Sequence, residues 1–247
     1  MLLKNKTVVL TGSNRGIGRS ILETFSSNGA NIFACVRKID ENFLNLIKSL
    51  KKLHGNEIFP IQIDLSNEES IKLAGKKILD EKKEIDVLIN NAGIIHTALF
   101  QMTSQDKIKE VFQVNLFSQT LFTQYILKSM LKKKNGSIIF ISSNSAMDGN
   151  IGRSAYSSSK AAIISLSKTL SRELGGVNIR VNTIAPGLTM TDMMKNNTSE
   201  KAVKEYTSAV FLQRLGKPNE IADLALFLSS DKSKYITGQV IRADGGI

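Results

Sequence analysis

Short apolar runs alternate with longer amphipathic stretches along the whole chain. The apolar runs predict strands at Thr7–Leu10, Asn31–Val36, Glu57–Ile63, Val87–Ile89, Ser137–Ile141, Arg180–Ile184 and Gln239–Arg242. Apolar positions three and four residues apart predict helices at Ile17–Ser27, Glu41–Leu53, Glu68–Leu79, Ser104–Lys132, Tyr156–Leu174 and Asn219–Leu228. Alternation of this kind is typical of a parallel sheet covered by helices on both faces. We therefore expect an α/β fold.

No repeat, linker or low-complexity tract divides the pattern, so we predict one Rossmann-type domain over residues 1–247. Its doubly wound parallel sheet would have about seven strands, with the third strand at the edge in the order 3-2-1-4-5-6. The prolines agree with this order. Pro60 lies inside the third strand, where an edge tolerates a missing donor, and Pro218 stands where a helix would begin.

Composition narrows the class of protein. The chain has 247 residues, of which 42% are hydrophobic, and no apolar run approaches the ~20 residues of a membrane span. Its first residues lack the apolar region of a signal peptide. The single cysteine, Cys35, excludes an intrachain disulfide and lies in an apolar stretch, which predicts a buried thiol. We expect a soluble cytoplasmic protein without a membrane partner.

Histidine and charge exclude two further classes of site. With only His54 and His96, a zinc site or a Ser-His-Asp triad is not expected, and we predict no metal. The net charge is +11, but the lysines are scattered, no aromatic residues lie between them, and no nucleic-acid motif occurs. A solvated basic surface that attracts anionic ligands or an acidic partner fits better than nucleic-acid binding.

The first predicted strand runs into a glycine-rich turn and then a helix. Gly12, Gly16 and Gly18 have the spacing G-x3-G-x-G. Gly12 allows a tight turn, Gly16 allows the backbone to approach a pyrophosphate, and Gly18 allows close packing of the helix. The N-terminus of that helix offers free N–H groups to phosphate oxygens. A lone glycine turn can also serve packing, but this one stands where a dinucleotide-binding turn belongs.

The end of the second predicted strand indicates which dinucleotide is bound. An NAD site has an acid there for the ribose 2′-hydroxyl. Here Arg37 follows the strand, and the nearest acid, Asp40, comes three residues later. Arg37 can pair with a 2′-phosphate, and Arg15 in the glycine turn can approach the same group. We therefore predict NADP(H) in preference to NAD(H).

Candidate chemistry centres on Tyr156 and Lys160, with Ser143 thirteen residues before the tyrosine. A tyrosine and a lysine four residues apart share one helix face. The cation would lower the tyrosine pKa from about 10 toward neutrality, so that it exchanges a proton with a carbonyl or alcohol oxygen. The pair alone also fits an ordinary solvated helix face, and the surrounding motifs decide between the two interpretations.

Those motifs follow in a fixed order: Thr11-Gly12 with Gly16-Ile17-Gly18, Asp64-Leu65, Asn90-Asn91-Ala92-Gly93, Asn115, Ser143, Tyr156 with Lys160, and Pro186-Gly187. In this order they resemble the short-chain dehydrogenase/reductases from end to end. The nearest likeness is to 3-oxoacyl-[acyl-carrier-protein] reductases. The resemblance implies a catalytic tetrad of Asn115, Ser143, Tyr156 and Lys160. A relative of the same fold that has lost catalysis is the alternative.

The resemblance also implies a role for each residue. Ser143 would hold the substrate carbonyl near Tyr156, Lys160 would bind the nicotinamide ribose, and Asn115 would hold a water. Asp64 and Leu65 would contact adenine, and Thr189 and Thr191 the nicotinamide carboxamide. The full cofactor-binding set comprises Gly12, Ser13, Arg15, Gly16, Ile17, Gly18, Arg37, Asp64, Leu65, Asn91, Ala92, Gly93, Tyr156, Lys160, Pro186, Gly187, Thr189 and Thr191.

The function that follows is an NADPH-dependent carbonyl reductase, in which Tyr156 supplies the proton. A 3-oxoacyl group on an acidic carrier protein suits the basic chain and its Lys132–Lys134 cluster. Val177 departs from the basic residue that such reductases commonly carry before the sixth strand. A sugar or small alcohol or ketone is the alternative substrate, and a non-catalytic NADP(H)-binding regulator or a nucleic-acid binder are the remaining classes.

Two further expectations follow from the same resemblance. The stretch from Met193 to Leu212 would form a mobile lid, with Met193 and Met194 lining an apolar pocket or packing in the core. The two long helices Ser104–Lys132 and Tyr156–Leu174, together with the C-terminal strand, would join four copies into a homotetramer.

Overall fold

The computed structural model describes residues 1–247 and contains one seven-stranded sheet. The strands are β1 (Thr7–Thr11), β2 (Asn31–Val36), β3 (Ile58–Gln62), β4 (Val87–Asn90), β5 (Gly136–Ile141), β6 (Ile179–Pro186) and β7 (Val240–Ala243). They lie in the order β3-β2-β1-β4-β5-β6-β7, and every neighbouring pair is parallel. The predicted Rossmann topology is confirmed, and Pro60 lies in the edge strand β3, where no further strand needs its missing N–H.

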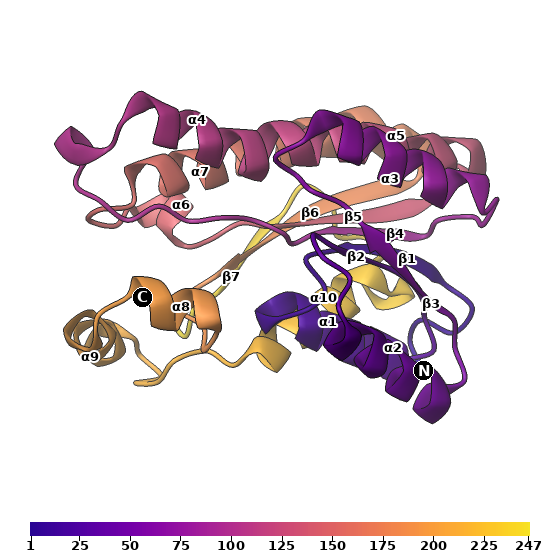
Figure 1. Ribbon diagram of the computed structural model, residues 1–247, viewed down its shortest axis with the longest axis horizontal. Coiled ribbons are helices and arrows are strands. Elements are labelled where there is room, and N and C mark those ends of the chain that lie inside the picture. The colour runs from indigo at the N-terminus through magenta and orange to yellow at the C-terminus, as the bar shows by residue number, and fades with distance from the viewer.

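Helices cover both faces of the sheet (Figure 1). One layer holds α1 (Gly16–Ser27), α2 (Glu41–His54) and α10 (Pro218–Ser229), and the other holds α3 (Glu68–Asp80), α5 (Ser118–Lys133) and α7 (Ser154–Leu174). Alternate strand residues feed two separate cores: Val8 and Leu10 pack with the first layer, and Val9 with the second. None of the helices is both long and apolar enough to cross a membrane.

The predicted helix Ser104–Lys132 is wrong as a continuous α-helix. The structure has α4 (Gln105–Phe112), then a π-helical turn at Gln113–Phe117, then α5. The sequence signal missed the turn because apolar spacing hardly changes over five residues. Single π-helical turns inserted in a helix are frequent at functional sites, and this one carries Asn115.

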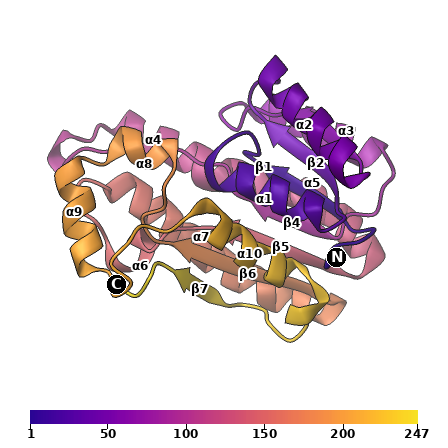
Figure 2. The same ribbon diagram turned by 90° about the horizontal axis from the view of Figure 1, so that it is seen from below.

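Three short helices lie beyond the carboxyl ends of the strands: α6 (Ser145–Asp148), α8 (Asp192–Asn197) and α9 (Glu200–Ala209). Figure 2 shows α8 and α9 at one end of the molecule, next to α4 and α6. Neither α8 nor α9 contains a buried residue. We call residues 192–209 the lid, because these two helices border the cavity described next.

Candidate active site

One cavity of about 860 Å³ lies at the carboxyl ends of the strands. Its volume is within the roughly 300–1,000 Å³ of ligand-binding pockets. Eighteen of the predicted site residues line it: Gly12, Arg15, Gly16, Ile17, Gly18, Arg37, Asp64, Leu65, Asn91, Ala92, Gly93, Ser143, Tyr156, Lys160, Pro186, Gly187, Thr189 and Thr191. Residues from distant parts of the sequence therefore meet at one edge of the sheet.

Ser13 and Asn115 do not line this cavity. The Ser13 side chain is buried, and its hydroxyl donates to the Cys35 carbonyl oxygen at 3.2 Å. It ties the glycine turn to β2, which is a different role from the cofactor contact that the motif indicated. Cys35 itself is buried as predicted, and burial raises the pKa of its thiol.

The glycine turn is shaped for a close approach. Gly12 has φ +69°, a left-handed conformation that favours glycine. A Cβ on Gly18 would collide with the Gly12 carbonyl oxygen and lie 2.5 Å from Asn91 Nδ2. Arg15, at the start of α1, makes no side-chain hydrogen bond to the first helical turn. The first N–H groups of α1 thus face the cavity end of the turn without a side-chain cap.

Thr11 braces this turn, and the motif analysis assigned it no role. Its hydroxyl accepts from the N–H of Asn91 at 3.0 Å and of Ala92 at 3.1 Å. The Asn91 amide in turn donates to the carbonyl oxygens of Thr11 and Gly12 at 2.9 and 3.2 Å. These bonds lock the loop after β4 to the loop after β1. A threonine as the last residue of the first strand is the signal that would have pointed to it.

The adenosine end of the cavity carries Arg37 and Asp64. Asp64 accepts hydrogen bonds from the Ser66 hydroxyl and N–H at 2.7 and 2.8 Å, and these bonds, followed by the charge of Arg37, lower its pKa. Arg15 and Arg37 are both exposed on the cavity wall. Asp40, the nearest acid after β2, accepts from the Phe43 N–H at 2.9 Å as the cap of α2. That bond orients the Asp40 carboxylate toward α2.

The ionisation of Tyr156 differs from the prediction. The side chain is only half-buried, since one part lines the cavity, yet the pKa is raised above its usual value because burial disfavours the phenolate. A hydrogen bond with Ser143 and the positive charge of Arg153 oppose the rise without cancelling it. The expectation that Lys160 would bring this pKa toward neutrality is therefore wrong.

Lys160 explains that correction. Its Nζ donates to the Ile141 carbonyl oxygen at 2.7 Å and lies 5.9 Å from the centre of the Tyr156 ring. Burial lowers the Lys160 pKa to about 8. Helical spacing does bring the two side chains to one face. The carbonyl at the end of β5, nineteen residues earlier in the chain, holds the ammonium group.

Asn115 fixes the loop beside this lysine. Its amide donates to the Ile94 carbonyl at 2.9 Å and to the Ser159 hydroxyl at 3.0 Å, and its Oδ1 accepts from the Ile94 N–H at 2.8 Å. A Cβ on Gly93 would lie 3.0 Å from Asn115 Oδ1 and 3.3 Å from Lys160 Nζ. Asn115 and Lys160 thus meet across Gly93, and the four predicted catalytic residues occupy one region.

Comparison with known proteins agrees with this geometry. The family model described as Enoyl-(Acyl carrier protein) reductase matches residues 12–247. The chain belongs to the short-chain dehydrogenase/reductase family. Members of this family are NAD(P)-dependent oxidoreductases that act on alcohol and carbonyl groups.

Relatives within the family are similar over their full length. The chain is 39% identical to the 3-oxoacyl-[acyl-carrier-protein] reductase of Thermotoga maritima over 248 residues, covering 100% of this chain and 99% of the relative. It is 40% identical to that of Chlamydia trachomatis, covering 100% and 98%. A solved structure of a gluconate 5-dehydrogenase from Beutenbergia cavernae, described as putative and NAD(P)-dependent, has a TM-score of 0.92 at 30% identity, with 98% and 96% covered.

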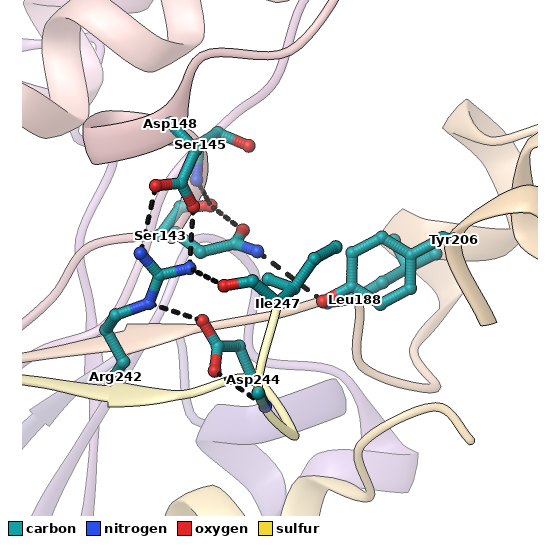
Figure 3. A network of polar contacts seen from close by, with 10 residues as sticks. Ser143, Ser145, Asp148, Leu188, Tyr206, Arg242, Asp244 and Ile247 are labelled. Atoms are coloured by element: carbon teal, nitrogen blue, oxygen red, sulfur yellow. Dashed lines mark hydrogen bonds and ion pairs between the residues drawn. The ribbon is translucent and has the colours of Figure 1, made fainter. Parts of the chain in front are cut away.

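The lid contributes contacts that the family motifs do not contain. The Tyr206 hydroxyl of α9 accepts from the Leu188 N–H at 3.0 Å and from the Asn144 amide at 3.4 Å, next to Ser143 (Figure 3). Arg242 of β7 binds both Asp148 oxygens, at 2.9 and 2.6 Å, and Asp244 at 2.6 Å. These bonds tie α6 and the end of the chain to the sheet beside the short-chain dehydrogenase/reductase site. Met193 and Met194 line the cavity rather than the core.

Proposed function

We propose that the protein is an NADPH-dependent reductase of 3-oxoacyl groups carried on a thioester. One observation supports this most directly. Ser143, Tyr156 and Lys160 line the same cavity as the glycine turn with its arginines, so that a bound dinucleotide and a carbonyl group would meet there. The full-length similarity to 3-oxoacyl-[acyl-carrier-protein] reductases supports the choice of substrate.

The residues present fit a dinucleotide. The cradle above Gly18 has no room for a Cβ, and the uncapped start of α1 offers N–H groups to phosphate oxygens. Arg15 and Arg37 would hold a 2′-phosphate, with Asp64 and Leu65 beside the adenine. Asn91, Ala92 and Gly93 would line the middle of the bound cofactor. When bound, the reduced nicotinamide supplies the hydride for the reaction.

The protein's part in the reaction is to hold the carbonyl and to supply a proton. Ser143 would donate a hydrogen bond to the carbonyl oxygen, and Tyr156 would transfer its hydroxyl proton to that oxygen as hydride reaches the carbon. Because burial raises the Tyr156 pKa, the hydroxyl stays protonated in the neutral pH range, which is the form that reduction needs. Lys160, with a pKa of about 8, would pass a proton back to the tyrosine.

A substrate screen tests the proposed function. We expect the purified protein to oxidise NADPH with an acetoacetyl thioester, with kcat/KM at least ~10-fold above that for ketogluconate or a small ketone, since a site built for two carbonyl oxygens rejects substrates lacking one. Highest activity on a keto sugar acid would instead support the alternative substrate class, which the gluconate dehydrogenase neighbours make specific. NADPH binding without turnover of any carbonyl would indicate a regulator.

Arg37 provides a test of cofactor preference. We expect wild-type protein to bind NADPH more tightly than NADH, and Arg37→Gln to weaken NADPH binding about tenfold while NADH binding stays the same, because only NADPH has a 2′-phosphate for the guanidinium. Fluorescence titration with both cofactors measures this. Arg19→Gln is the control, since Arg19 is exposed on α1 and pairs with Glu23 at 2.9 Å. Equal wild-type affinities for the two cofactors would contradict the assignment.

An acidic carrier protein is the proposed partner, but the basic cluster at the end of α5 is smaller than the sequence indicated. Lys133 binds Asp86 at 2.8 Å and Glu84 at 3.1 Å, whereas Lys132 and Lys134 are exposed. Arg180 donates to backbone carbonyls of Leu228 and Ile236, so it does not replace a basic residue at Val177. We also propose a homotetramer joined through α5, α7 and β7.

A further inference from the structure

The residue that precedes the catalytic helix is unusual for its position. Arg153 is the N-cap of α7, and its side chain makes no capping hydrogen bond. A positive charge is unfavourable at the N-terminus of a helix, because the helix dipole is positive there. The guanidinium is half-buried, and burial lowers its pKa, yet a guanidinium remains charged at any neutral pH. Local helix stability therefore does not explain this arginine.

Contacts of Arg153 lead to the lid. Its Nη2 donates to the Asn197 carbonyl oxygen at 2.6 Å and lies 3.4 Å from the Thr198 hydroxyl, at the end of α8. Its Nη1 is buried and has no hydrogen-bond partner. Unpaired buried donors are rare, and those that native proteins retain often serve a function. Arg153 thus joins the start of the catalytic helix to the lid.

The same side chain lies beside the proton donor. Arg153 and Tyr156 are three residues apart at the start of α7, where side chains at this spacing are neighbours, and both line the cavity. The other ionisable side chains on the cavity walls are Arg15, Arg37, Lys38, Asp40, Asp64, Glu110, Lys160, Asp192, Glu205 and Tyr206. Among all of these charges, that of Arg153 is the one that lowers the Tyr156 pKa.

We propose that Arg153 is a positioning residue that holds the lid over the cavity and makes Tyr156 a stronger proton donor while the lid is held. The electrostatic role that the motif assigned to Lys160 belongs in this chain to Arg153, since the Ile141 carbonyl holds the Lys160 ammonium. The link has a physical basis in one side chain that touches both elements. This inference rests on the proposed carbonyl reduction.

Removing the charge is the first test. In Arg153→Gln we expect the Tyr156 titration midpoint to move to higher pH, because a nearby cation no longer favours the phenolate. The basic limb of kcat/KM for acetoacetyl thioester reduction should move with it, since reduction requires protonated Tyr156 and fails as pH rises through its pKa. At neutral pH, kcat should fall about tenfold, because a weaker acid transfers its proton more slowly. Phenolate absorbance, minus that of the matching Tyr156→Phe protein, isolates this tyrosine among the four present.

Two further variants separate charge from shape. Arg153→Lys keeps a positive charge but has one donor group in place of the fork, so we expect the Tyr156 midpoint to stay close to wild type while amide hydrogen exchange in residues 192–209 speeds up. Arg172→Gln makes the chemical change of the first variant at an exposed position of the same helix. We expect wild-type titration, exchange and activity from it.

The outcomes distinguish the two proposals. An unchanged Tyr156 midpoint in Arg153→Gln, or unchanged exchange in the lid of both Arg153 variants, would overturn the role of Arg153, whatever the activity. Wild-type protein that reduces no thioester would overturn the proposed function, and the absorbance titration and the exchange data would still decide the Arg153 contacts. If Arg153→Gln does not fold, a shifted midpoint or unaltered lid exchange in Arg153→Lys contradicts the proposal.

Discussion

Replacing Tyr156 with phenylalanine should lower turnover of a 3-oxoacyl thioester at least ~100-fold, the usual scale for losing a general acid. Phenylalanine keeps the ring that lies near Lys160 and removes only the hydroxyl that forms the hydrogen bond with Ser143. NADPH affinity should therefore change by no more than about twofold. Stopped-flow measurement of NADPH oxidation gives turnover, and fluorescence titration gives affinity.

Tyr235→Phe is the matched control, because Tyr235 is fully exposed and lies outside the cavity. It removes the same hydroxyl and should leave turnover and affinity at the wild-type level. Near-normal turnover in Tyr156→Phe would exclude this tyrosine as the proton donor. A loss of NADPH binding as large as the loss of turnover would show that the hydroxyl acts on the cofactor instead.

The second large effect is expected at Gly18. In Gly18→Ala the new Cβ would collide with the Gly12 carbonyl oxygen and lie 2.5 Å from Asn91 Nδ2, so the turn must move. We expect NADPH affinity to fall at least ~10-fold and the free energy of unfolding to fall by about 1–3 kcal/mol, as for other overpacked sites. Helix propensity alone predicts the opposite, a gain of about 1 kcal/mol for alanine over glycine.

Gly176→Ala is the control for this prediction. No atom lies within 4 Å of where its Cβ would be, so the change should leave cofactor binding as it is. Isothermal titration with NADPH and urea unfolding of both variants give the two quantities. Unchanged NADPH affinity in Gly18→Ala would contradict the assignment of this turn to the phosphates.

Local sequence patterns predicted most of the framework. Strand β2 begins and ends at the predicted residues, and helices α1, α2 and α3 differ from the predicted bounds by only one residue at an end. Such segments are readable because burial on both faces requires continuous apolar runs, and because one-sided burial gives a helical spacing. The lid helices α8 and α9 went unpredicted, since neither buries a residue and neither therefore carries an apolar face.

The candidate site divides in the same way. Glycine spacing and the chain order of the motifs located the cavity residues, because parallel strands bring the loops at their carboxyl ends to one edge. Ser13 and Asn115 were exceptions. Both side chains satisfy backbone groups of neighbouring segments, and no local pattern encodes those partners.

The sequence by itself determined the fold, the order of the strands and the chemical groups at the carboxyl edge of the sheet. These depend on polarity and spacing along the chain, which a sequence contains. Only the tertiary structure decided how those groups ionise. Burial raises the Tyr156 pKa, the carbonyl of Ile141 holds the Lys160 ammonium, and Arg153 links the lid to the tyrosine. A pKa depends on desolvation and on the nearest charges in space, and those charges come from segments far apart in the chain.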